Sequence, residues 1–129
     1  MRWGQSITVT AGTSQSSPET LRVKLSLGII ERGVVFFPPG CHGYVHIAFF
    51  HREHQFLPNH PRETIAGDDY VFDMALDYEL SEKPANIEIV TWNEDTTNPH
   101  TIQVQVFVRT TGVDRIRDAI TALFLGGGG

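Results

Sequence analysis

The chain is poor in the groups that build disulfide-linked, membrane-spanning or metal-clustered proteins. Its 129 residues include one cysteine, Cys41, which excludes an internal disulfide and a zinc site made of several cysteines. No apolar run approaches the roughly 18 residues that suggest a membrane-spanning helix. The first residues, MRWGQS, lack an apolar signal core, so we expect no export signal.

Basic residues are also scarce. The chain has 10 Lys and Arg against 15 Asp and Glu, a net charge of −5, which argues against a dedicated nucleic-acid binder. With 40% hydrophobic and 19% charged residues the composition is that of a folded chain, with room for one domain. No GxSxG elbow, P-loop or dinucleotide glycine fingerprint occurs. We therefore expect a non-enzymatic protein with no catalytic residues and no cofactor.

Alternation of apolar and polar residues is the main structural signal. It extends over residues 21–27, 70–80 and 102–109, as in strands with one buried and one solvent-facing side. Runs of β-branched and aromatic residues predict shorter strands at 7–10, 30–37, 44–51 and 87–92. Turn signals such as Pro38-Pro39-Gly40 separate these strands. The pattern predicts an all-β fold, an antiparallel β-sandwich or jelly roll of about seven or eight strands.

The C-terminal end changes to a helical period. Its apolar residues recur at helical spacing, at Val113, Ile116, Ile120 and Leu123, with Phe124 beside them. Thr111-Gly112-Val113-Asp114 fits a capping box. We predict one amphipathic helix over about 113–125, a single domain over 1–125, and a flexible glycine tail over 126–129, either native or an added linker. The apolar stripe packs on its own sandwich or meets a neighbouring subunit.

Histidine is the first candidate for chemistry, because imidazole is the commonest metal ligand. Five histidines lie within one stretch: His42, His46, His51, His54 and His60. Residues three apart on a continuing strand face opposite sides, so His51 and His54 would meet only if the chain turned between them. No HExxH or Cys/His zinc spacing occurs. We expect surface or subunit-contact histidines and no metal, with a metal site as the alternative.

A second candidate is copper. Trp92-Asn93-Glu94-Asp95 followed by His100 resembles the segment where cupredoxins place their first copper histidine. A blue-copper site needs a thiolate, a second histidine and usually a methionine, which in cupredoxins come later in the chain. Here none follows His100, and Cys41 lies upstream. The preferred interpretation is a packed Trp92 and a turn shaped by Asn93 and Asp95.

Carboxylates and the single thiol are further candidates. Asp68-Asp69 lie in an expected loop, and Asp73, Asp77 and Glu79 share one strand face. Calcium or paired acid catalysis would use such groups, but a solvated acidic face is the default interpretation. Cys41 and His42 are adjacent, so on extended backbone their side chains point apart, and no catalytic thiol is expected.

The middle of the chain, from about Leu21 to Val108, resembles small β-rich proteins encoded among the structural genes of tailed phages and related viruses. The matching segments are Phe36-Phe37-Pro38-Pro39-Gly40-Cys41-His42-Gly43, His54-Gln55, Gly67-Asp68-Asp69-Tyr70, Trp92-Asn93-Glu94-Asp95 and His100-Thr101-Ile102. This resemblance implies a virion component, such as a capsid decoration, cement or neck protein. It implies a location in the virion or the host cytoplasm, partners among particle proteins, and no catalytic residues.

Adjacent aromatic residues agree with a role in assembly. Phe49-Phe50 and Phe36-Phe37 must each place one ring in the core and the other on the opposite face, and Trp3 poses the same question. Surplus apolar faces on a small domain often mark protein contacts, and symmetric oligomers use them. We therefore expect a homo-oligomer without nucleic-acid or membrane partners.

The possible interface is the C-terminal stripe of Val113, Ile116, Ile120, Leu123 and Phe124. Two alternatives stay open at this stage. One is a cupredoxin-like metal-binding domain. The other is a ligand-binding β module for carbohydrate, in which Trp92, Tyr44 and Tyr70 would be the residues to test.

Overall fold

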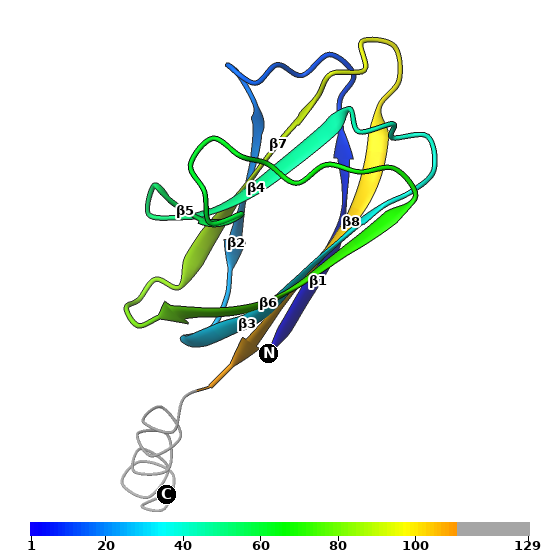
Figure 1. The fold of residues 1–129 in the computed structure, drawn as a ribbon. Coiled ribbons are helices and arrows are strands. Elements are labelled where there is room, and N and C mark those ends of the chain that lie inside the picture. The colour runs from blue at the N-terminus through cyan, green and yellow to red at the C-terminus, as the bar shows by residue number, and fades with distance from the viewer. Residues whose placement is uncertain (111–129) are drawn as a thin grey trace, which may run out of the picture.

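Eight antiparallel strands form two four-stranded sheets in the computed structural model, which describes residues 1–110 (Figure 1). The first sheet has the order β1 (Arg2–Val9), β8 (His100–Arg109), β3 (Gly28–Phe37), β6 (Tyr70–Leu80). The second has the order β2 (Glu19–Lys24), β7 (Asn86–Asn93), β4 (Val45–His51), β5 (His54–Leu57). The predicted all-β, antiparallel class is confirmed. The helix predicted over 113–125, its five interface residues and the glycine tail lie outside the described residues.

The strands arise where apolar and polar residues alternate. In β8 the four aliphatic residues Ile102, Val104, Val106 and Val108 are all buried, whereas Gln103 between them is exposed. The bounds of β6 match the predicted 70–80, and five other predicted strands differ from the observed ones by up to three residues at an end. The strand predicted over 7–10 is wrong at its start, because β1 begins five residues earlier, at Arg2. Alternation therefore locates both the strands and the side of each that enters the core.

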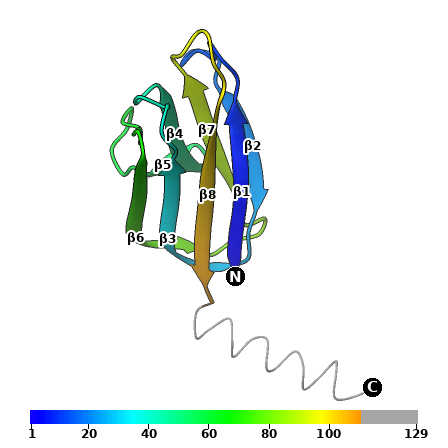
Figure 2. The same cartoon turned by 90° about the vertical axis from the view of Figure 1, so that its right-hand side faces the viewer.

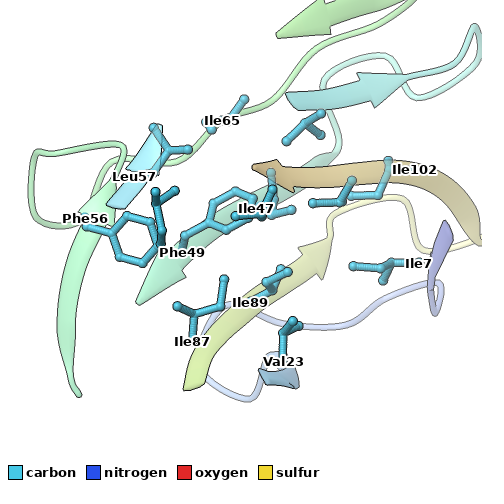
Figure 3. Close-up of a cluster of buried hydrophobic side chains, with 14 of the residues drawn as sticks. Ile7, Val23, Ile47, Phe49, Phe56, Leu57, Ile65, Ile87, Ile89 and Ile102 are labelled. Carbon is cyan, nitrogen blue, oxygen red and sulfur yellow. The ribbon is translucent and has the colours of Figure 1, made fainter. Parts of the chain in front are cut away.

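The two sheets share one hydrophobic core. Its side chains come from strands of both sheets, as Figure 3 shows for Ile7 and Ile102 of the first and Phe49 and Ile89 of the second. Every connection crosses from one sheet to the other except the β4–β5 hairpin. Strands that are neighbours in a sheet are therefore distant in the chain, as where Arg2 pairs with Phe107.

One strand, β5, was not predicted. Its hairpin turn consists of Arg52 and Glu53, both at positive φ, 50° and 69°. Two-residue hairpin turns of this kind usually carry Asn-Gly or Asp-Gly, so these two residues give no sequence signal of a turn. The hairpin pairs His51 directly with His54.

The two sheets differ in how their edges are covered. In the first sheet β1 and β6 are the edge strands, and Figure 2 shows β6 at one side of that sheet and β1 at the other. β6 is the longest strand, with 11 residues, whereas β5, the edge strand of the second sheet, has four. The edge strands β6 and β5 therefore differ in length by seven residues.

Candidate functional site

The outer face of the second sheet carries an apolar groove of about 480 Å³. Its floor is built from alternating residues of two paired strands, Ala48 and Phe50 of β4 and Val90 and Trp92 of β7. Ala48 and Trp92 are buried although they face away from the core. The pair Phe49-Phe50 behaves as predicted, because Phe49 is fully buried in the core and Phe50 lies on the groove floor.

Two loops wall the groove with polar side chains. The β1–β2 loop supplies Gln15 and Pro18, and the loop after β5 supplies Asn59, Pro61, Arg62, Glu63 and Thr64. The Gln55 side chain fixes the second loop, because its amide nitrogen lies 2.9, 3.1 and 2.8 Å from the carbonyl oxygens of Pro58, His60 and Glu63. The groove is thus preorganised, with an apolar floor and polar walls of the kind that small ligands use.

Trp92 on the groove floor is part of a ring stack. His46 stacks on Trp92 with ring centres 5.1 Å apart and planes 11° apart. Its Nδ1 lies 2.7 Å from the Thr64 hydroxyl, and its Nε2 lies 3.4 Å from a Glu94 oxygen. His46 therefore holds the Thr64 wall over the sheet.

The second candidate surface is the β6 edge. The exposed large apolar side chains of residues 1–110 are Met1, Tyr44, Tyr70, Val71 and Met74, and three of them belong to β6. Met74 is 38% exposed, and its ladder partner is Gly33, which has no side chain to cover it. The outward row of β6 carries the exposed acids Asp73, Asp77 and Glu79. This edge combines apolar surface, acidic charge and a strand side that pairs with no other described strand.

The histidines are spread over separate contacts. The turn after His51 brings His51 and His54 together, but both contact Tyr78: His51 Nδ1 lies 2.8 Å from its hydroxyl and His54 stacks on its ring. Burial lowers the pKa of His51, and the charges of Arg52 and His54 lower it further. This cluster fastens the short β5 hairpin to β6.

The segment that resembles a cupredoxin copper loop forms a hydrogen-bonded turn. Asn93 is fully buried, and its amide donates to the carbonyls of Val9 and Asn98 while its oxygen accepts the Asp95 amide. Asp95 Oδ2 lies 2.8 Å from His100 Nε2. A backbone hydrogen bond from Thr97, the contact with His100 and a backbone hydrogen bond from Asn98 lower the pKa of Asp95 to about 2. The turn that was predicted from Asn93 and Asp95 is confirmed.

Cys41 lies in a loop held by Asp68. One Asp68 oxygen accepts the backbone amides of Gly40 and His42, which lowers the pKa of this carboxyl. Cys41 is fully buried, and burial, together with the Asp68 charge, raises the pKa of its thiol. A protonated, covered thiol has little nucleophilic character.

The three aromatic residues considered for sugar binding do not line one site. Trp92 is only 8% exposed and belongs to the groove, whereas Tyr44 and Tyr70 are exposed and outside it. The groove residues Ala48, Val90 and Gln55 had no distinctive signal in the sequence. For this face of the second sheet, the sequence signal of an apolar outer surface was the adjacent pair Phe49-Phe50.

Within residues 1–110 no three His, Cys, Asp or Glu side chains gather closely enough to hold a metal ion. The same part of the chain contains no helix with the length and hydropathy needed to cross a bilayer. No family model, curated protein or solved structure matches the chain.

Proposed function

We propose that the chain is a jelly-roll assembly protein that acts through contacts with copies of itself and with other proteins of a virus particle. The pairing pattern supports the jelly roll, because β1 pairs with β8, β2 with β7, β3 with β6, and β4 with β5. Four strands followed by their four partners in reverse order is the arrangement of a jelly roll, which occurs in viral capsid and lectin domains.

The observation that carries the assembly function is the β6 edge. A long, exposed edge strand with apolar side chains is a template for pairing with another chain, and monomeric proteins usually blunt such edges. Here Val71 and Met74 are 52% and 38% exposed on an 11-residue strand. The resemblance of residues 21–108 to phage structural-gene products gives this assembly its proposed place, as a decoration, cement or neck protein. The C-terminal stripe over 113–124 is proposed as a second contact.

To test this proposal, the mass of the protein in solution and its metal content are measured on one sample that was purified without chelator. The proposal predicts a metal-free closed oligomer or filament. Replacing Ile120 and Leu123 with Ser should weaken association while a cooperatively folded monomer remains. A monomer carrying stoichiometric copper or zinc would contradict the proposal.

The groove supports a second candidate function, a ligand-binding module. Its volume and its apolar floor below polar walls suit a small ligand with one apolar face, such as a sugar ring. Binding of a panel of oligosaccharides to the chain and to Phe50→Ser tests this function. The ligand-binding function predicts at least one binder whose affinity falls in the variant. Equal binding by both proteins, or none, would contradict it.

A further inference from the structure

The two outer strands of the first sheet, β1 and β6, differ in character. β1 and β6 end the strand order β1-β8-β3-β6, and each pairs on one side only among the described strands. The directions alternate along this order. Because the sheet has an even number of strands, a second copy placed beside it in the same orientation presents β1 antiparallel to β6. The sheet can therefore continue from one molecule into the next without reversing either copy.

Residues that lie opposite one another in successive strand pairs form rows across the sheet, and a second copy would align with these rows. One row across the sheet is Trp3–Val106–Gly33–Met74, and a second is Gln5–Val104–Val35–Phe72. A copy displaced along these rows places its Trp3 opposite Met74 and its Gln5 opposite Phe72. Trp3 and Met74 are both incompletely buried, and a thioether against an aromatic ring is a favourable contact.

On the outward-facing side, the charges of the β1 and β6 edges are opposite in sign. Arg2 shares a row with Phe107, Arg32 and Ala75, so the arriving Arg2 would lie opposite Ala75. The diagonal neighbours of Ala75 on that face are Asp73, whose two oxygens already accept hydrogen bonds from Arg32, and Asp77, which is within reach of a long side chain. β6 carries three acids and no base, whereas β1 carries Arg2 and no acid.

Pairing of the β6 edges of two copies is less favourable than pairing of β6 with β1. An antiparallel pair that uses the strand's full length is centred on Ala75 and sets Asp73 of each copy opposite Asp77 of the other. Like charges directly opposite each other destabilise a strand pair. The acidic row therefore disfavours a two-fold β6 contact and favours a strand such as β1.

We infer that a second copy docks its β1 edge on the β6 edge, with Trp3 against Met74 and Arg2 beside Asp77. This inference rests on the proposed function and specifies its contact. The contact is heterologous, since it joins different surfaces of two identical molecules, and it produces a ring or a filament.

The test uses two variants, each with one edge blocked. Met74→Glu puts a carboxylate on the β6 contact, and Gln5→Glu puts one on the β1 contact. Both added charges are negative, so the two blocked edges also repel each other. Urea unfolding checks that each variant folds. Sedimentation velocity then compares the parent, each variant alone, and their equimolar mixture.

The inference predicts that the parent associates and that each variant alone sediments as a 14.4 kDa monomer. The mixture should form a dimer of twice that mass, because one intact β6 edge meets one intact β1 edge. A variant that still dimerises alone, or a mixture that stays monomeric, overturns the inference. If the parent itself is monomeric, the proposed self-assembly fails as well, so the two failures are distinguishable.

Discussion

Arg32 holds Asp73 through two parallel hydrogen bonds across the β3–β6 ladder. Nε donates to Oδ1 at 2.8 Å and Nη2 to Oδ2 at 2.6 Å, which lowers the pKa of the Asp73 carboxyl. The same guanidinium lies over the Phe107 ring of β8, 5.0 Å from its centre. One side chain therefore joins three strands on the outer face of the first sheet, beside the proposed contact.

The first prediction separates the two contacts of Arg32. Asp73→Asn should lower the free energy of unfolding only slightly, because exposed ion pairs contribute little. Arg32→Ala should lower it more, because it also removes the contact with Phe107. Urea denaturation of both variants checks this order. An equal loss in the two variants would show that the ring contact has no effect.

The second prediction concerns the groove wall. Gln55→Ala removes an amide nitrogen whose two hydrogens are shared among three loop carbonyls, and a net hydrogen bond contributes about 0.5–1.5 kcal/mol. We expect a loss of about 1–3 kcal/mol in unfolding free energy and faster amide exchange in residues 58–64. Gln55→Glu is the matched control, because it keeps the shape but replaces the donor with an acceptor. If Gln55→Glu retained parental stability, the hydrogen bonds would not be what fixes the loop.

The third prediction concerns acid stability. The pKa of Asp95 falls from 3.8 to about 2 in the folded protein. A carboxyl whose pKa is lower in the folded than in the unfolded state stabilises the fold at pH values above its unfolded pKa, and this stabilisation is lost as the carboxylate is protonated. The contribution of Asp95 to the free energy of unfolding should therefore disappear as the pH falls from about 4 toward 2. Melting temperatures of the parent and Asp95→Asn should therefore differ at pH 6 and converge near pH 2. A difference independent of pH would contradict this origin.

The fourth prediction tests which side of β8 faces the core. Val104 is 1% exposed, so Val104→Asp would bury an unpaired charge, which costs several kcal/mol or more, and should prevent folding. Gln103→Asp puts the same group on the exposed side one residue away and should fold. Circular dichroism and urea unfolding distinguish the two. A Val104→Asp protein that melts like the parent would show that the strand faces the other way.

The sequence predicted the strands where alternation is long and uninterrupted, as in β6 and β8. It missed β5, because the turn of Arg52 and Glu53 is specified by the surrounding structure and not by turn-forming residues. It indicated that one ring of Phe49-Phe50 needed a second cover, but not that this ring is Phe50 or that the loops at 10–18 and 58–64 supply the cover. Loop placement depends on contacts between distant segments, such as those of Gln55 and His46. The exposure of Met74 likewise depends on the register that sets it opposite Gly33.

The most direct test of assembly through the sheet edges is amide hydrogen exchange at increasing protein concentration. Edge pairing predicts that protection rises with concentration in the two edge segments, Arg2–Val9 and Tyr70–Leu80, because a second copy covers amides that bond to no other described strand. The central strands β3 and β8 should exchange at a constant rate. Exchange in both edges that does not change over a concentration range where the mass increases would contradict the account.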